Sequence, residues 1–325
     1  MCTAISFHGR DFYLGRTLDT EYDFGEVPVF AGRRFSYFNE EEKNGRYAII
    51  GMAKVIGGYP LFFDGMNEEG LCMAALNYGT LAAYAEGDEG EGRVAPFRLI
   101  PYILSRCKNL TEAKEALENI TLVNKSPASE LDVARLHFII ADKTGAITAE
   151  PEECGLKIYE NPFGVLSNAP EFPYHEKNLS YYMNVTPAEA ENRFSNRLVL
   201  TPYGRGVGSF GLPGDLSSPS RFVRACFYKF NLPPLEGDEG ENLSNIFHVL
   251  GSVEQIRGAV RVKDGLVHTR YASVMNANTG VYYYKTYGSF RINAVSMLLE
   301  NPDNDEIVEF PLHCLEVPNL VNKKD

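Results

Sequence analysis

The chain begins Met1-Cys2, and this cysteine is the first residue whose type and position could do chemistry. Cysteine is small, so the initiator methionine ahead of it can be removed, and Cys2 would then carry both a thiol and a free α-amine. In unperturbed peptides the amine titrates at about 7.7–8.0 and the thiol at about 8.5, so one residue would hold a nucleophile and its proton acceptor. The alternative is that Cys2 is a small buried apolar residue, as free cysteines usually are.

The residues after Cys2 predict a hairpin that could bring charged side chains to it. Apolar and alternating residues surround the turn-like stretch 8–11, as expected for two antiparallel strands within residues 2–18. If the two ends of this turn pair with each other, Cys2 lies opposite Thr17. Asp19 is then diagonally across on the same face, at about 7–8 Å between backbone positions, where its carboxylate could orient the α-amine.

Arg16 completes this group of charged residues. Strict alternation places Arg16 on the face opposite Cys2, although a bulge or the frayed end of the hairpin could turn it inward. Beside the thiol, its guanidinium would favour the thiolate form. The alternative is that Arg16 and Asp19 form a solvated surface pair, which contributes little to stability.

We expect no cofactor and no metal. The stretch 206–211 has the letters of a dinucleotide-binding loop, but no apolar strand precedes it and a Pro-Gly pair prevents a helix from following. The six histidines show no HxxxH or HxH spacing, so a metal site is not indicated. A dyad of Cys72 or Cys226 with His248 or His268 stays open, because such partners meet only in space.

The composition indicates an ordinary globular protein with an acidic surface. Of the 325 residues 44% are hydrophobic, and the formal net charge is -12. This charge argues against nucleic acid or an anionic membrane as the partner. No apolar run approaches the roughly 18 residues of a membrane helix, and the first residues do not show the basic start and apolar stretch of a signal peptide. We therefore expect a cytoplasmic protein without membrane insertion, whose six scattered cysteines are reduced.

Strand-like and helix-like segments occur in blocks along the chain. Strands are expected at 2–7, 12–18, 46–56, 59–78 (two strands joined at 67–70), 135–142, 146–150, 155–161, 163–168, 266–276, 280–287 and 291–297, and helices at 97–107, 111–120, 220–230 and 243–260. This order favours helices on the outer faces of sheets over βαβ repeats. We therefore predict an α+β fold, a four-layer αββα sandwich of two antiparallel sheets between helix layers, as a single domain over 1–325. Residues 171–214 carry few periodic runs and predict a long excursion with little regular structure, which usually means function or contact with a partner chain.

Five motifs, in their order along the chain, resemble those of the choloylglycine hydrolase family. They are MCTAISF (1–7), GRTLD (15–19), DGMNEEGL with ALNY (64–78), GVLSNAP (164–170) and GLPGDLSSPSRFVRACF (211–227). The family comprises bile salt hydrolases and penicillin V acylases, which are N-terminal-nucleophile hydrolases with an αββα fold. The resemblance runs from Cys2 to about residue 310 without a large gap.

The resemblance implies a role for each matching residue and hydrolysis of an amide through a thioester, without a cofactor. The matching positions are Cys2 (the nucleophile exposed by removal of Met1), Arg16 (beside the thiol), Asp19 (orients the α-amine), Asn77 and Asn168 (line the active site, one of them helping to hold the oxyanion) and Arg221 (completes the polar cluster).

The residue at position 77 bears on the substrate. Bile salt hydrolases carry asparagine here and penicillin V acylases typically carry tyrosine, so Asn77 implies glycine- or taurine-conjugated bile salts as the small-molecule partner. A penicillin V acylase, or another N-acyl amidase of the same mechanism, is the alternative. A steroid needs a large apolar wall. Our candidates for that wall are Leu18, Ile56, Tyr59, Phe62 and the segment 125–131.

The resemblance also implies a homotetramer, because the excursion 171–214 corresponds to a segment that reaches across subunits in bile salt hydrolases. A third possibility, from another class, is a binding or assembly protein that has kept the fold without the chemistry. Such a protein would have lost the nucleophile or its partners, and this sequence retains all of them.

Overall fold

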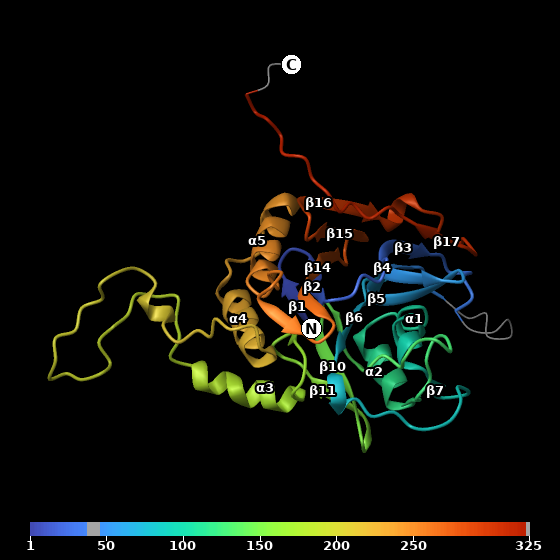
Figure 1. Cartoon of the computed structure of the whole chain (residues 1–325), viewed down its shortest axis with the longest axis horizontal. Coiled ribbons are helices and arrows are strands. Elements are labelled where there is room, and N and C mark those ends of the chain that lie inside the picture. The colour runs from blue at the N-terminus through green and yellow to red at the C-terminus, as the bar shows by residue number, and fades with distance from the viewer. Residues whose placement is uncertain (38–45, 323–325) are drawn as a thin grey trace.

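The structure, a computed structural model, describes residues 1–37 and 46–322 of the chain. Two antiparallel sheets pack face to face at its centre, and helices cover the outer face of each sheet (Figure 1). The predicted α+β class and the four-layer αββα sandwich are therefore confirmed.

The first sheet has seven strands and carries the start of the chain near one edge. Its strands are β1 (Cys2–His8), β2 (Phe12–Thr20), β12 (Val165–Leu166), β13 (Val260–Val262), β14 (Gly265–Asn276), β15 (Val281–Thr286) and β16 (Ser289–Ser296). Their order is β12-β1-β2-β14-β15-β16, and β13 pairs with β14. Every residue of β2 is buried, because both faces of the sheet are covered. Arg16, Thr17 and Asp19 are therefore buried too, and each needs hydrogen-bond partners.

The second sheet has eight strands. They are β3 (Val27–Ala31), β4 (Ile49–Ile56), β5 (Tyr59–Asn67), β6 (Cys72–Asn77), β9 (Leu136–Asp142), β10 (Gly145–Glu152), β11 (Gly155–Glu160) and β17 (Ile307–Glu309), in the order β11-β10-β9-β6-β5-β4-β3-β17. The sequence did not predict β3 and β17. Pro28 gives β3 no ladder donor at its second position, and β17 is too short to show alternation. A separate parallel pair joins β7 (Arg93–Val94) and β8 (Thr121–Leu122).

Within residues 1–37 and 46–322, five α-helices form the outer layers (Figure 1). On the eight-stranded sheet lie α1 (Leu99–Leu104) and α2 (Leu110–Glu118), whereas α3 (Phe172–Leu179), α4 (Ser218–Asn231) and α5 (Glu239–Gly251) lie on the side of the seven-stranded sheet. Short 3-10 helices occur at Gly79–Leu81, Pro96–Arg98, Ser180–Tyr182, Val207–Ser209 and Met297–Leu299. The helix expected at 243–260 ends at Gly251 and begins earlier, where the Asp238 side chain accepts a hydrogen bond from Glu241 N.

Two hydrophobic clusters follow from this layering. The larger cluster fills the space between the sheets and beneath α4 and α5, and it contains Cys2 and Leu18. The smaller cluster lies between the eight-stranded sheet and the helices α1 and α2, and it contains Phe62 and Leu99. The head of β1 is therefore enclosed on both faces of its sheet.

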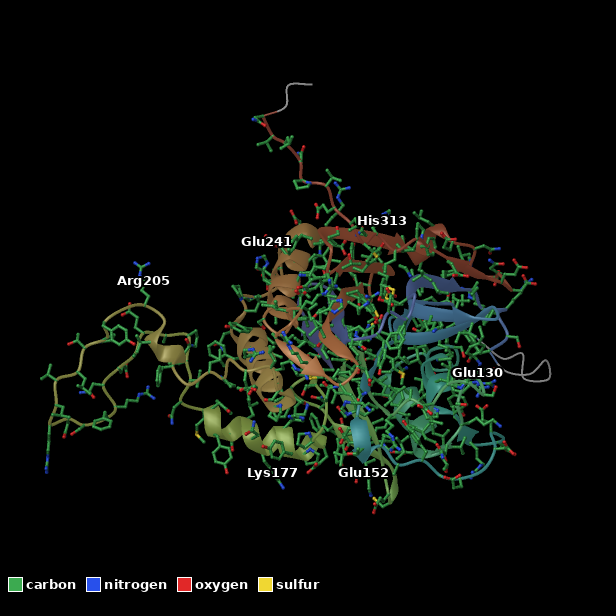
Figure 2. The ribbon with its side chains drawn as sticks, in the orientation of Figure 1. Glu130, Glu152, Lys177, Arg205, Glu241 and His313 are labelled. Carbon is green, nitrogen blue, oxygen red and sulfur yellow. The ribbon has the colours of Figure 1, made fainter. Side chains whose placement is uncertain are left out.

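The excursion 171–214 leaves the body of the molecule as a long arm (Figure 1). It is not irregular throughout, because α3 forms its first part. Beyond that helix the chain runs without strands, and Figure 2 places Arg205 on the arm, well away from the sheets. Phe194 and Tyr203 on the arm are 82% and 96% exposed. No helix in the described part of the chain is long and apolar enough to cross a membrane.

Candidate active site

The pairing of β1 with β2 decides which side chains share a face with Cys2. Cys2 pairs with Leu18 and His8 pairs with Phe12, so the predicted pairing of Cys2 with Thr17 is wrong by one residue. The turn has three residues, Gly9 to Asp11, and Gly9 N donates to the carbonyl oxygen of Asp11 at 3.1 Å. A shift of one residue turns every side chain of a strand to the other face.

The corrected register reverses two expectations. Ala4 pairs with Arg16, so Arg16 lies on the same face as Cys2, without a bulge or a frayed end. Asp19 lies on the opposite face, and its predicted diagonal contact with Cys2 on a shared face is wrong. The guanidinium therefore points between the two sheets, and the carboxylate points toward the helices α4 and α5.

Arg16 is fully buried and is held by groups from both sheets. Its Nη1 donates to Asp64 Oδ2 of β5 at 3.2 Å and to the Tyr271 hydroxyl of β14 at 3.1 Å. The Tyr271 and Tyr282 hydroxyls donate to the same carboxylate. Burial lowers the pKa of Arg16, but Tyr271, the Cys2 thiol and Asp64 together raise it by more than burial lowers it. The guanidinium therefore stays charged. A fixed positive charge therefore faces the region of the thiol.

Arg221 approaches the head of β1 from the helix side. It lies in the first turn of α4, a helix that has proline in its opening turn, where proline is well tolerated. Its Nη1 donates to the carbonyl oxygen of Cys2 and to Thr3 Oγ1, and its Nη2 donates to Asn168 Oδ1 at 2.6 Å. Burial lowers the pKa of Arg221, while Asp19 and Cys2 oppose this shift. A second guanidinium thus binds the main chain of the candidate nucleophile.

Asp19 contacts the N-terminus through its main chain. The ammonium of Met1 donates to the carbonyl oxygen of Asp19, whereas the Asp19 carboxylate accepts from Thr269 Oγ1 at 2.7 Å and from Thr17 Oγ1 at 3.2 Å. Burial raises the pKa of Asp19, and the charges of Arg221 and of the N-terminal amine work against this. The Asp19 side chain is therefore held on the face of the sheet opposite to the Cys2 side chain.

The two asparagines meet beside Cys2. Asn168, which follows β12, accepts a hydrogen bond from Cys2 N on Oδ1 at 2.8 Å, and its Nδ2 donates to the carbonyl oxygen of Asn77 at 2.7 Å. Asn77 is the last residue of β6 and is exposed, and its own Oδ1 accepts from Gly79 N. The structure therefore brings all six predicted catalytic residues to one place, at the junction of the two sheets.

The predicted substrate wall is only partly brought together. Leu18 is buried in the cluster that contains Cys2. Phe62 and Tyr59 pack in the cluster beneath α1 and α2, on the other face of the eight-stranded sheet, and Ile56 lies at the tip of the β4–β5 hairpin. Tyr59 and Phe62 therefore lie away from the face that carries Cys2, and for Phe62 the bulge after Met52 is the cause.

Two aromatic rings that the sequence analysis did not single out lie on the correct side. Phe24 and Phe63 pack against the cluster that contains Cys2, are only partly buried, and have ring centroids 5.3 Å apart. Alternation from Asp64 would place Phe63 on the opposite face, so only the bulge in the pairing of β4 with β5 brings its ring to this side. Segment 125–131 is an exposed or half-buried loop.

Asp64, Tyr271 and Thr269 were also missed as parts of the site. Asp64 offered a signal, since it is a lone carboxylate at the end of an apolar strand, and a buried charge needs a partner. Tyr271 and Thr269 offered none, because they come from β14, about 250 residues away along the chain. Their contribution depends on pairing that only the folded sheet shows.

The alternative cysteine–histidine dyads are not formed. In the part of the chain that the structure describes, no hydrogen bond joins Cys72 or Cys226 to His248 or His268. Burial raises the pKa of Cys72 well above its ordinary range and that of Cys226 to about 12, so both thiols stay protonated. Among the described residues, no group of three or more histidine, cysteine, aspartate or glutamate side chains is placed to hold a metal ion.

An αββα sandwich with a cysteine at the head of an inner strand of one sheet is the arrangement of the class of N-terminal-nucleophile hydrolases. Residues 2–310 match the linear amide C–N hydrolases, choloylglycine hydrolase family. The chain therefore belongs to the choloylglycine hydrolase family, and it is an amidohydrolase that acts on linear amides.

Known proteins of this family resemble the chain over its whole length. A bile salt hydrolase/transferase of Lactiplantibacillus plantarum is 41% identical, over 96% of this chain and 97% of the relative. One from Clostridium perfringens is 34% identical over 99% and 100%. The crystal structure of a conjugated bile acid hydrolase from Clostridium perfringens superposes with a TM-score of 0.90 at 32% identity, over 99% and 100% of the two chains. A penicillin V acylase from Agrobacterium tumefaciens shares the fold, with a TM-score of 0.71 at 20% identity, over 91% and 86%.

Proposed function

We propose that this protein hydrolyses the amide bond of glycine- or taurine-conjugated bile salts, with Cys2 as the nucleophile once Met1 has been removed. The observation that carries the proposal is the environment of Cys2, whose main chain is held by Asn168 and Arg221 at a point between two buried guanidinium groups. Relatives up to 41% identical over nearly the whole chain are named bile salt hydrolases.

The reaction needs a nucleophile, a proton carrier and donors aimed at the developing oxyanion. The Cys2 thiolate attacks the amide carbonyl carbon, and the carbonyl π electrons move to the oxygen. The α-amine of Cys2 carries the thiol proton and delivers it to the leaving glycine or taurine nitrogen as the C–N bond breaks. Water, activated by the same amine, then attacks the thioester, and the bile acid leaves as the thiolate re-forms.

The surrounding residues can be given roles in these steps. Arg16 supplies a permanent positive charge on the face of the thiol, which favours the thiolate. Asn168 holds the nitrogen of Cys2 with Oδ1 and has a second N–H on Nδ2 for the oxyanion, since only one is used by Asn77. Arg221 fixes the carbonyl of Cys2, and Asp19 supports the strand end beside the amine.

The apolar wall for a steroid is proposed to consist of Leu18 with Phe24 and Phe63, since all three lie in or against the cluster that contains Cys2. Partly exposed aromatic rings suit the flat apolar face of a steroid and need few polar anchors. Asn77 at its family position supports bile salts over penicillin V. A penicillin V acylase or another N-acyl amidase of the same mechanism is the alternative.

A second activity, transfer of the acyl group to an amine, is favoured by the names of two relatives, which are called hydrolase/transferases. The thioester would then be attacked by an amino group instead of water, which forms a new amide and releases the same thiolate. Incubation of a conjugated bile salt with a second, isotope-labelled amino acid tests this, because only transfer puts the label into a new conjugate.

We also propose that the protein is a cytoplasmic homotetramer whose subunits contact each other through the arm 171–214. The support is the row of exposed apolar side chains on that arm, which a monomer would leave in water. All six cysteines are free, as in a reducing compartment.

The deciding experiment for the substrate is product analysis. Purified protein is incubated with glycocholate, taurocholate and penicillin V in parallel, and the free acid and amine are quantified by mass spectrometry. The proposal expects release of glycine or taurine at rates far above any hydrolysis of penicillin V. Preferential cleavage of penicillin V would select the alternative.

A further inference from the structure

A buried pair of side chains, His137 of β9 and Glu150 of β10, lies next to the segment that carries Asn168. Neither side chain has any exposed surface. His137 Nδ1 lies 2.9 Å from Glu150 Oε1, and His137 Nε2 lies 3.0 Å from the carbonyl oxygen of Ser167. No step of the reaction proposed above uses either residue, so their burial in a polar network needs another reason.

The hydrogen-bond partners of this pair define how many protons it holds. The carbonyl oxygen of Ser167 can only accept, so His137 Nε2 carries a hydrogen. The second carboxylate oxygen of Glu150 accepts from the Tyr78 hydroxyl at 3.2 Å and from Phe172 N at 3.0 Å. One more proton must lie between Nδ1 and Oε1, because two lone pairs facing each other in a buried site would be strongly unfavourable. The pair is therefore joined by one shared proton between the imidazole and the carboxyl group.

This pair connects the elements that carry the two asparagines of the site. Ser167, which His137 holds by its carbonyl oxygen, directly precedes Asn168. Tyr78 directly follows Asn77, donates to the carboxylate and stacks on the imidazole, with ring centroids 4.5 Å apart and planes 15° apart. One buried network thus sets the relative position of the two chain segments beside Cys2.

The main chain of Asn168 is held in the same way from its other side. Its carbonyl oxygen accepts from His175 Nε2 at 2.8 Å and from Ser218 Oγ at 2.7 Å. Burial lowers the pKa of His175, and His137 lowers it further. His175 therefore donates as a neutral imidazole. The main chain of Asn168 consequently cannot shift away from Cys2 without breaking these hydrogen bonds.

We propose that His137 and Glu150 are positioning residues that hold Asn168 and Asn77 in the geometry required for amide hydrolysis. The proposal rests on the function proposed above, since it assigns these residues to that same site. A displacement of about 1 Å at a reacting group can cost about 100-fold in rate. The pair therefore acts on the chemical step through Asn168 and does not touch the substrate.

The test is a double-mutant cycle between His137→Phe and Asn168→Ala. Phenylalanine keeps the stacking on Tyr78 and removes both hydrogen bonds. In the otherwise native protein we expect His137→Phe to lower kcat about 10- to 100-fold with KM changed less than about threefold. In the Asn168→Ala background the same change should lower kcat by less than about threefold. Equal losses in both backgrounds would overturn the proposal, because the residue would then act on the fold in general, and so would the absence of any loss.

Two further variants keep the test decisive. If His137→Phe does not fold, His137→Gln carries the same cycle with a smaller expected loss, because its amide can keep the hydrogen bond to Ser167 but not the one to Glu150. A glutamine at position 150 can donate to His137 Nδ1 and accept from Tyr78, so Glu150→Gln should retain at least about tenfold more activity than Glu150→Leu. Similar activities of these two variants would contradict the positioning role. The exposed His248 on α5 offers the control His248→Phe, which should behave as the native protein.

The hydrogen bond from His137 to Ser167 can be measured without any substrate. Nitrogen NMR of histidine-labelled protein should show a hydrogen on Nε2 of His137, the nitrogen that donates to Ser167, in the native protein and in Glu150→Gln. A native protein whose His137 carries no hydrogen on Nε2 would overturn the proposal even if bile salts are cleaved. A native protein that shows this hydrogen but cleaves neither glycocholate nor penicillin V would overturn the proposed function alone.

Discussion

Arg16 and Arg221 reach the head of strand β1 from opposite faces of the same sheet. Arg16 lies on the face that packs against the second sheet, where it pairs with Asp64, and Arg221 enters from helix α4 and donates to the carbonyl oxygen of Cys2. Both guanidinium groups are completely buried. Cys2 therefore lies between two buried guanidinium groups. Each has its own hydrogen-bond partners, so each can be tested by a separate substitution.

Replacement of the nucleophile gives the first prediction. Cys2→Ala should abolish amide hydrolysis, and Cys2→Ser should lose most of it, because a serine hydroxyl is far harder to ionise than a thiol. The measurement is the rate of amine release together with intact mass, which reports whether Met1 is removed in each variant. Full activity in correctly processed Cys2→Ser would contradict thiolate catalysis.

Loss of the oxyanion donor should be severe but incomplete. Asn168→Ala is expected to lower kcat about 100- to 1000-fold, less than Cys2→Ala. Asn161, also buried, donates to Thr148 Oγ1 and to the carbonyl oxygen of Val165, away from Cys2. Asn161→Ala should therefore reduce thermal stability and change kcat by less than about threefold. Equal kcat losses in the two variants would argue against a special role for Asn168.

The support of Arg16 can be tested at Asp64. Asp64→Asn leaves the buried guanidinium without its carboxylate, so we expect a loss of about 3–5 kcal/mol in the free energy of unfolding, measured by denaturant titration. The control is Glu68→Gln, which neutralises an ion pair with the half-exposed Arg33. That change should cost less than about 1 kcal/mol. A similar small cost at Asp64 would mean that Arg16 does not depend on it.

Lys229 should make stability depend on alkaline pH. Burial lowers the pKa of Lys229 to about 8 from its ordinary value of 10.5. Between these two values Lys229 holds fewer protons in the folded protein than in the unfolded chain, so the contribution of Lys229 to stability rises with pH from about 8 to 10.5. Lys229→Met should remove this contribution, so the difference in the free energy of unfolding between the native protein and the variant should change by about 3 kcal/mol in favour of the native protein over this range.

The control for this measurement is Lys114→Met. The Lys114 amine is exposed and donates to Glu160, and its pKa is raised. Unfolding curves at several pH values should therefore show the same pH dependence for Lys114→Met as for the native protein. If Lys229→Met also keeps the native pH dependence, the Lys229 amine titrates normally in the folded state.

The arm 171–214 should control assembly. Phe194→Ser combined with Tyr203→Ser removes two exposed aromatic side chains from it, and we expect the mass measured by light scattering to fall from four subunits to fewer. Phe290 on β16 is 86% exposed and lies outside the arm, so Phe290→Ser should leave the mass unchanged. A native protein that is monomeric at micromolar concentration would contradict the proposed tetramer.

The sequence alone predicted which neighbouring residues could act together, because residues near each other in the chain stay close in any fold. Arg16 and Asp19 could be tied to Cys2, since all three belong to one hairpin, and the αββα class followed from the order of strand and helix blocks. Periodic segments such as β9, β14 and α4 were placed close to their observed bounds. The family resemblance, confirmed over residues 2–310, pointed to Asn77, Asn168 and Arg221.

The tertiary structure decided which face of a strand each side chain occupies and which distant residues it contacts. One extra residue in the turn before Phe12 turned Arg16 toward the thiol and Asp19 away from it, and local propensity does not determine that length. Tyr59 and Phe62 were apolar enough for a substrate wall, yet both pack in the core beneath α1 and α2, where a bulge turns the ring of Phe62. The carboxylate for Arg16 and the imidazole that binds Ser167 beside Asn168 come from strands far away in the chain, because a buried polar group is balanced by whichever element the sheets bring next to it.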